Sequence, residues 1–251
     1  MTIDALLTPN NSEPEDIYEG ALLVMIDVLR ASTTICAALE AGAREVIPTA
    51  ALERAVQIYG ALSPERRFLG GERDGIKPSG FDAGNSPLEY TPDAVAGRTV
   101  ILSTTNGAPL FLRYKFAAAR IVGSFVNFDA VMAFLRERIE SGADRVAFFC
   151  AGSNGRFSYE DALCAGAFID ELSIEYPDAS FGDAAAAARN LFALHAPGLK
   201  SYLKTREHAQ KLIRLGFEQD IDVALDFNRF PVTPFIEGAS IKRAKNLAEI
   251  G

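Results

Sequence analysis

The chain alternates apolar runs with small-residue amphipathic stretches, and this alternation limits its fold more than any other feature. The runs ALLVMID (21–27) and RVAFFCA (145–151) are apolar throughout, which is typical of strands buried on both faces. The same pattern is found in REVIPT, RRFLGGE, RTVILST and ARIVGS. Repeated strand–helix alternation predicts a mainly parallel sheet covered by helices. We therefore expect an α/β fold with a mostly parallel or mixed sheet, helices on both faces in three α/β/α layers, and the active site at the C-terminal ends of the strands.

Helical stretches follow nearly every apolar run, and two of them carry start and stop signals. STTICAALEAGA (32–43) begins with a hydroxyl N-cap and closes at Gly42, and NFDAVMAFLRERIESG (127–142) begins at Asn127 and closes at Gly142. A third helix is expected in DAAAAARNLFALHA (183–196), whereas Pro231 and Pro234 interrupt the mixed pattern of the last fifty or so residues. With 251 residues, 49% of them hydrophobic, the chain can bury a substantial core. We expect a single domain over 1–251 and leave open a division into two α/β lobes, about 1–125 and 126–251, with the site between them.

The overall charge limits the partners of the chain. A net charge of -8 argues against general affinity for nucleic acid or anionic lipid, because both need a basic surface. No apolar run is long enough to cross a bilayer or to act as a secretory signal, and the 3 cysteines do not suggest a disulfide framework. We expect a cytoplasmic protein without nucleic-acid or membrane partners, and we leave open whether it forms a homodimer.

Polar residues collect at four places where predicted strands end. The first is IDVLRASTTI, in which Asp27 ends a strand and Arg30, Ser32 and Thr33 lead into a helix whose first amides would face an anion. Alternatively, a hydroxyl only caps the helix and Asp27 is a turn residue. The charged pair of Asp27 and Arg30 in an otherwise apolar setting favours the functional interpretation.

The second place is the longest irregular segment, GGERDGIKPSGFDAGNSPLEY (70–90). A loop of this length is uncommon in a compact domain and is usually functional. Its glycines let backbone amides close on a ligand, its cations Arg73 and Lys77 can hold acidic groups, and its carboxylates, Glu72 and Asp82 among them, can hold a metal. The alternative is a solvated, flexible loop.

The third place is STTNGAP (103–109), where hydroxyls and the turn-forming Asn106 and Gly107 stand between a strand and a helix. This segment could equally be an N-cap cluster without a ligand.

The fourth place, RVAFFCAGSNGRFSYED (145–161), supports two different chemistries. Cys150 precedes Arg156 by six positions, the spacing with which cysteine-dependent phosphatases surround a phosphate. Those enzymes carry Ser or Thr directly after the arginine, and Phe157 occupies that position here. The neighbouring pair Glu160 and Asp161 is more typical of a metal site. The segment CAGSNG could also bind an anion through its backbone N–H groups alone.

Together, VMIDVLRASTTI, GGERDGIKPSGFDAGNSPLEY, STTNGAP and CAGSNGRFSYEDALCAG resemble the ordered signatures of the ComB-like 2-phosphosulfolactate phosphatases. The resemblance spans about residues 23–166, and beyond 181 it rests mainly on IRLGFEQDIDVAL. It implies a Mg²⁺-dependent acid phosphatase that hydrolyses (2R)-phospho-3-sulfolactate to sulfolactate and phosphate, a step on one route to coenzyme M. The implied partner is therefore a small anionic phosphomonoester.

With this resemblance, the four places can be assigned roles. Phosphate monoesters hydrolyse very slowly unaided, so the phosphoryl charge must be neutralised and a nucleophile placed in line. Oxygen ligands suit Mg²⁺, and with only His195 and His208 we do not expect a histidine-built zinc site. The expected catalytic residues are Asp27, Arg30, Glu72 and Asp161. The expected metal ligands are Asp27, Glu72 and Asp161, with Asp82 or Glu160 as substitutes.

The substrate's anionic groups are expected to bind Arg30, Arg73 and Lys77. Further expected contacts are made by Ser32, Thr33, Asn85, Ser86, Thr104, Thr105, Asn106, Gly107, Cys150, Ala151 and Gly152. Two alternatives remain: a cysteine mechanism using Cys150 and Arg156, and a non-catalytic binding protein for small anionic metabolites. A haloacid-dehalogenase mechanism is excluded because it needs a second acid two residues after Asp27, where Leu29 stands.

Overall fold

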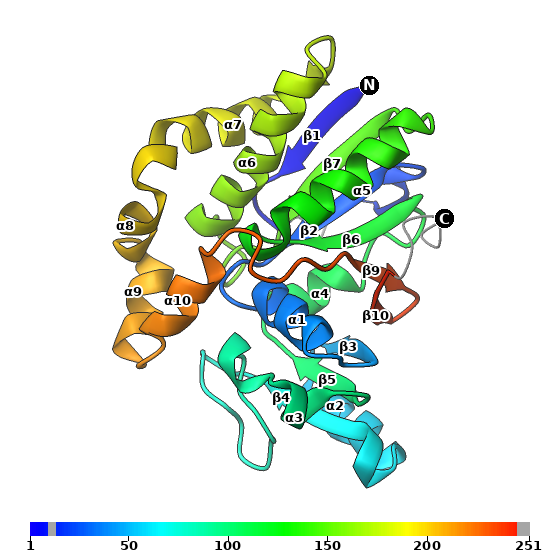
Figure 1. Ribbon diagram of the computed structural model, residues 1–251, viewed down its shortest axis with the longest axis vertical. Coiled ribbons are helices and arrows are strands. Elements are labelled where there is room, and N and C mark those ends of the chain that lie inside the picture. Colours follow the sequence, from blue (N-terminus) through cyan, green and yellow to red (C-terminus); the bar gives the residue numbers. More distant parts are fainter. Residues whose placement is uncertain (10–13, 245–251) are drawn as a thin grey trace.

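The computed structural model describes residues 1–9 and 14–244. Its strands are β1 (Thr2–Leu6), β2 (Leu22–Ile26), β3 (Glu45–Thr49), β4 (Arg67–Gly71), β5 (Thr99–Ser103), β6 (Ala119–Gly123), β7 (Arg145–Cys150), β8 (Ser180–Phe181), β9 (Pro234–Glu237) and β10 (Ser240–Arg243). They form one 10-stranded sheet in the order β4-β5-β3-β10-β9-β6-β2-β7-β1-β8 (Figure 1). Pairing is parallel except where the β9–β10 hairpin joins β6 and β3. The predicted mixed sheet is confirmed.

The six strands expected from continuous apolar runs all form, as β2 to β7. The structure adds four strands that the apolar pattern did not identify. β1 is inserted between β7 and β8, and the β9–β10 hairpin is inserted between β3 and β6. Strands from before and after residue 125 therefore alternate within one sheet.

The helices are α1 (Ala31–Glu40), α2 (Leu52–Ala61), α3 (Pro92–Val95), α4 (Gly107–Phe111), α5 (Phe128–Glu140), α6 (Tyr159–Glu175), α7 (Asp183–His195), α8 (Leu199–Lys204), α9 (Glu207–Arg214) and α10 (Glu218–Ala224). The three expected helices correspond to α1, α5 and α7. The expected hydroxyl N-cap of α1 is wrong: Arg30 occupies the N-cap position, and the backbone N–H of Ala31 donates to Asp27 Oδ1 at 3.2 Å. No helix in the described residues is both long enough and apolar enough to cross a membrane.

The strand β2 shows how helices cover both faces of the sheet. Its residues Leu22, Val24 and Ile26 belong to a core that includes side chains from α5 and α6. The alternate residues Leu23 and Met25 belong to a second core with side chains from α1 and α4. Because successive side chains of a strand point to opposite faces, both faces of β2 are buried, which explains why its sequence is apolar throughout.

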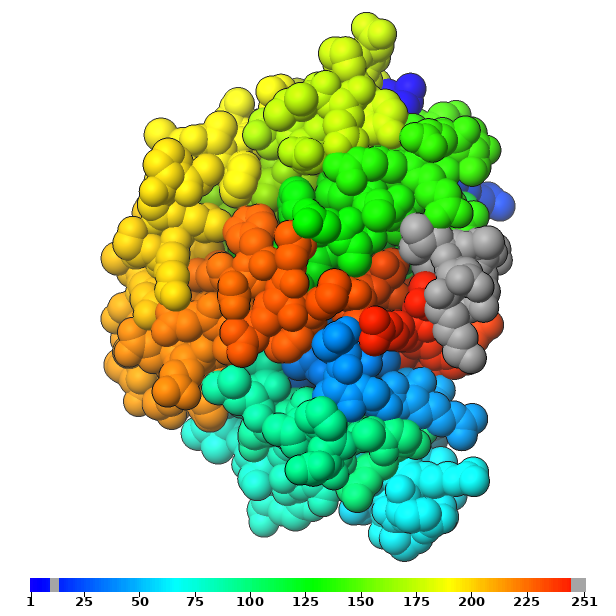
Figure 2. Space-filling model, in the orientation of Figure 1, coloured from blue at the N-terminus to red at the C-terminus, as the bar shows by residue number. Residues whose placement is uncertain are grey.

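The C-terminal helices lie beside the long loop that follows β4. Figure 2 shows the orange segment that contains α10 next to the teal segment of the loop. Contacts agree with this view, since α10 packs against the short 3₁₀ turn Pro87–Glu89. A methyl group added to Gly75 would come within 2.9 Å of Leu215. Two segments far apart in the sequence thus enclose one side of the C-terminal edge of the sheet.

Candidate active site

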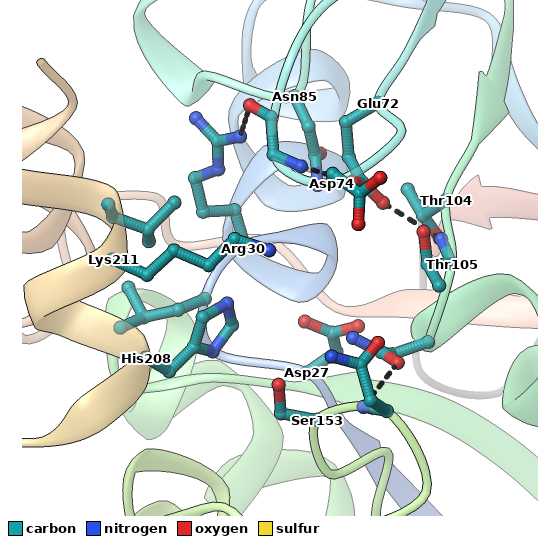
Figure 3. A pocket seen from close by; sticks show the side chains of 15 residues that line it. Asp27, Arg30, Glu72, Asp74, Asn85, Thr104, Thr105, Ser153, His208 and Lys211 are labelled. Atoms are coloured by element: carbon teal, nitrogen blue, oxygen red, sulfur yellow. Dashed lines mark hydrogen bonds between the residues drawn. The ribbon is translucent and has the colours of Figure 1, made fainter. Parts of the chain in front are cut away.

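A pocket that opens to solvent lies at the C-terminal ends of the strands, as the fold predicts; its space not filled by atoms, open solvent included, is about 490 Å³. Three of its residues directly follow a strand: Asp27 after β2, Glu72 after β4 and Thr104 after β5. Ser153 lies three residues beyond the end of β7. In Figure 3, His208 and Lys211 of α9 reach in from the opposite side.

Asp27 is the buried acid of this pocket, with 5% of its surface exposed. Loss of water contact raises the pKa of its carboxyl group to about 7, and His208 partly opposes this shift while Glu72 and Glu160 add to it. A methyl group added to Gly107 would lie 2.7 Å from Asp27 Oδ2, so only glycine leaves room for the carboxylate at this position. A buried carboxylate among other acids is stabilised when a cation neutralises it.

Glu72 connects two loops at the pocket. Its Oε2 accepts a hydrogen bond from the backbone N–H of Gly75 at 2.8 Å, and its Oε1 accepts one from the N–H of Thr105 at 2.8 Å (Figure 3). Asp74 lines the pocket beside it. The long loop is thereby fixed onto the turn after β5, and the solvated-loop alternative does not describe this part of it.

Asp161 joins the segments that follow β2 and β7. Its Oδ1 accepts from the backbone N–H of Val28 at 2.8 Å, and its Oδ2 accepts from the N–H of Gly152 at 2.9 Å. Burial and then Asp27 raise the pKa of its carboxyl group well above the usual value. Asp161 is not among the residues that line the pocket.

The neighbouring Glu160 is 2% exposed and pairs with His208, whose Nδ1 lies 2.6 Å from Glu160 Oε1. Burial alone would lower the pKa of His208, but the Glu160 hydrogen bond and charge raise it. Because Nδ1 is engaged, Nε2 is the ring nitrogen left for the pocket.

Only one of the three expected substrate-binding cations lines the pocket, and it is already paired. Arg30 donates to Asp220 Oδ2 at 2.7 Å and to the carbonyl of Gly75 at 2.8 Å, and its guanidinium lies 4.3 Å from the ring centre of Phe217. In Figure 3 this guanidinium lies on the Asn85 side of the pocket, away from Asp27.

The other two expected cations lie outside the pocket. Arg73 donates to the carbonyls of Glu72 and Ala50, both at 2.6 Å, and so braces the loop. Lys77 is exposed. The pocket instead receives Lys211.

The neutral candidates divide into residues that line the pocket and residues that build it. Asn85, Thr104, Thr105 and Asn106 line it. Asn85 is 4% exposed, and its Oδ1 has no hydrogen-bond partner in the described chain.

Three hydroxyl candidates are used within the fold. Ser32 Oγ accepts from the N–H of Asp27 at 2.8 Å, Thr33 Oγ1 donates to the carbonyl of Val28 at 2.8 Å, and Ser86 Oγ donates to Asp220 Oδ1 at 2.6 Å. These contacts shape the walls around the pocket.

The segment that suggested a cysteine phosphatase does not form such a site. Cys150 is fully buried, and burial followed by Asp161 raises its thiol pKa well above the usual value. Arg156 is exposed. The N–H groups of Ala151 and Gly152 are taken by Ile26 and Asp161, and the pocket is lined by the next residues, Ser153 and Asn154. A protonated, enclosed thiol is a poor nucleophile.

A magnesium ion fits the donors that line the pocket. Among residues 1–9 and 14–244, no three His, Cys, Asp or Glu side chains form a ready metal cluster. Mg²⁺ commonly takes one or two carboxylates and completes its shell with water and substrate phosphate. Asp27, Glu72 and Asp74 supply such carboxylates. Asp82, an alternative ligand, accepts from the N–H of Leu69 at 2.8 Å and does not line the pocket.

Three residues near the site have no role predicted from the sequence: His208, Lys211 and Asp220. All lie beyond 181, where the resemblance is thinnest. Asp220 is 2% exposed and holds both Arg30 and Ser86. Asp220 stands among other polar residues in GFEQDIDVAL, so no local pattern marked it.

Comparison with known proteins adds an independent finding. A family model described as 2-phosphosulpholactate phosphatase matches residues 6–239. A protein of Thermotoga petrophila named probable 2-phosphosulfolactate phosphatase is 39% identical over 211 residues, covering 84% of this chain and 87% of the relative. Relatives with the same name occur in Symbiobacterium thermophilum, 38% identical over 91% of this chain and 97% of the relative, and in Caldanaerobacter subterraneus, 33% identical over 98% of this chain and 100% of the relative.

Proposed function

The chain belongs to the 2-phosphosulpholactate phosphatase family and is therefore a phosphoric monoester hydrolase, and from this premise we propose that it hydrolyses (2R)-phospho-3-sulfolactate to 3-sulfolactate and phosphate with Mg²⁺ as cofactor. The names of the relatives support the substrate. The observation that carries the proposal is the convergence of Asp27, Glu72 and Asp74 on one pocket at the C-terminal ends of the strands. We also propose that the reaction takes place in the cytoplasm, on a route to coenzyme M.

Different residues of the pocket have different proposed roles in phosphoryl transfer. Asp27 and Glu72, with Asp74 beside them, would hold Mg²⁺, which when bound supplies positive charge to the phosphoryl oxygens. Thr105 and Asn106 offer hydrogen-bonding groups from the turn after β5, and Asn85 offers them from the loop. Positioning and electrostatic stabilisation account for most of the rate enhancement in such reactions.

His208 adds a group that can exchange a proton. Its Nδ1 is held by the buried Glu160 carboxylate, which orients the ring so that Nε2 serves the pocket. A held imidazole of this kind can donate a proton to the departing lactate oxygen or accept one from an attacking water.

Two measurements test this function. Purified protein should release phosphate from phosphosulfolactate, EDTA should abolish the release, and Mg²⁺ should restore it. Cys150→Ser should keep most of the activity, because the thiol is buried and protonated. A folded Cys150→Ser protein without any turnover would instead support the cysteine mechanism, and a Mg²⁺-loaded wild type that binds sulfolactate without hydrolysing its phosphate ester would support a binding protein.

A further inference from the structure

A second cavity opens from the candidate active site on the side of α9. Its space not filled by atoms, open solvent included, is about 1350 Å³, against about 490 Å³ for the pocket. Four residues line both spaces: Ser153, Asn154, His208 and Lys211. We call the larger space the α9 chamber; its other walls come from the turn after β7, the start of α6 and α9.

The α9 chamber is basic although the chain carries a net charge of -8. Its charged lining includes the cations Arg156, Arg206, Lys211 and Arg214. One of its two acids, Glu160, is buried and paired with His208. The neighbouring pocket contains the acids Asp27, Glu72 and Asp74, so the cations of the chamber lie next to the carboxylates that would hold a metal.

Most of these cations are available to a ligand. Within residues 1–9 and 14–244, the side chains of Arg156, Lys211 and Arg214 make no hydrogen bond and no ion pair. Lys204, outside the chamber, shows the contrast, since its Nζ lies 2.9 Å from both Glu218 and Asp222. The guanidinium of Arg206 is held by Thr205 Oγ1 and lies 4.5 Å from the ring centre of Tyr202.

Lys211 stands where the chamber meets the pocket. It is three residues from both His208 and Arg214, a spacing that places side chains on neighbouring positions of a helix surface. In Figure 3 its side chain extends from α9 into the pocket, between Arg30 and His208. Its ammonium group can therefore contact a ligand whose other end lies at Asp27.

We propose that Lys211 binds the sulfonate of the substrate and that the α9 chamber is the entrance through which this anion is drawn. The inference rests on the proposed function. Phosphate and sulfonate are carried on neighbouring carbons, so a phosphate held through Mg²⁺ at Asp27 and Glu72 would leave the sulfonate close to Lys211. The arginines of the chamber do not line the pocket. Lys211 makes the contact, and Arg156, Arg206 and Arg214 act through their field, which raises the encounter rate.

Lys211→Ala tests the contact with three substrates: phosphosulfolactate, phospholactate, which lacks only the sulfonate, and p-nitrophenyl phosphate. We expect kcat/KM for phosphosulfolactate to fall about 30-fold or more, and kcat/KM for the other two to change far less. Lys211→Arg, which keeps the charge, should recover part of the loss. The matched control is Lys115→Ala, which removes one exposed positive charge from the turn before β6 and should change none of the three values.

A second variant tests the entrance. Arg214→Ala should lower kcat/KM for phosphosulfolactate at low ionic strength and weaken its dependence on salt, because one steering charge is removed. Equal losses on all three substrates in Lys211→Ala would overturn the sulfonate assignment while leaving the phosphatase intact. A wild-type enzyme that hydrolyses p-nitrophenyl phosphate but not phosphosulfolactate would instead overturn the proposed substrate, and the inference with it.

Discussion

Asp27 combines burial, negative charge and close neighbours of the same sign. Its pKa is raised to about 7 chiefly by loss of water contact, so the folded protein carries an energetic cost for ionising it. Residues of this kind reduce the stability of the free protein, and their contribution becomes favourable when a cation or substrate is bound. Gly107 provides the space for this carboxylate, since any larger side chain would collide with Oδ2.

Asp27→Asn should therefore separate activity from stability. Measured in EDTA at neutral pH, the melting temperature of the variant should equal or exceed that of the wild type, because no charge has to be buried. With Mg²⁺ present, kcat should fall roughly 100-fold or more, the scale of losing one electrostatic contact in the transition state. A variant that unfolds easily but retains the wild-type kcat in its folded fraction would show that Asp27 is a turn residue.

The helix α10 connects the start of α1 with the long loop after β4, two parts of the chain that are not neighbours in the sheet. Asp220 accepts from Arg30 at the start of α1 and from Ser86 in the long loop. The ion pair is enclosed, with both side chains 2% exposed. The two partners lie 190 residues apart in the sequence. Their contact therefore ties the C-terminal helices to the start of α1, beside the pocket.

Asp220→Ala should destabilise the protein by about 3–5 kcal/mol, since it leaves the Arg30 guanidinium buried without its counter-charge. Urea unfolding measures this loss. Replacing both partners, as in Arg30→Met with Asp220→Leu, should recover most of the stability. Asp226→Ala is the control, because its ion pair with Arg229 is largely exposed, and it should change stability little. A loss no greater than that of the control would mean that the buried pair does not hold α10.

At the scale of the whole molecule, the chain is acidic, and carboxylates converge on one end of its sheet. Asp27, Glu72 and Asp74 line the pocket, with Glu160 and Asp161 buried close behind. The sheet brings them together because parallel strands deliver their C-terminal ends to the same edge. Burial and the neighbouring acids raise the pKa values of Asp27 and Asp161, so ionising these two groups opposes folding until positive charge is supplied.

Mg²⁺ should therefore stabilise the entire fold. A ligand at 100 times its Kd adds about 2.7 kcal/mol to the folded state, and each kcal/mol shifts the melting temperature of a protein of this size by roughly 2–4 °C. Thermal melts with Mg²⁺, with EDTA, and with NaCl at equal ionic strength measure the effect. Asp27→Asn should lose most of the shift. Identical melting temperatures in Mg²⁺ and NaCl would contradict a metal site at Asp27.

Six of the strands, β2 to β7, and the end of the sheet at which the pocket lies could be predicted from the sequence. Each of β2 to β7 contains a continuous run of apolar residues, and that local pattern reflects burial on both faces. Asp27, Glu72 and Thr104 could be found because each directly follows such a strand. These residues needed no knowledge of distant contacts.

The other strands and the partners of the charged side chains depend on contacts between segments that are far apart in the sequence. β1 has the mixed sequence TIDAL, and β9 and β10 have only 4 residues each. They pair with strands far along the chain. Arg30 and Arg73 look equally available in the sequence, yet one is bound by Asp220 and the other by loop carbonyls. His208 and Lys211 reach the pocket only because α9 packs beside the loop. The local pattern of apolar residues predicts whether a residue is buried. The partner of a charged side chain depends on which segments come into contact in the folded chain, and the local pattern does not contain that information.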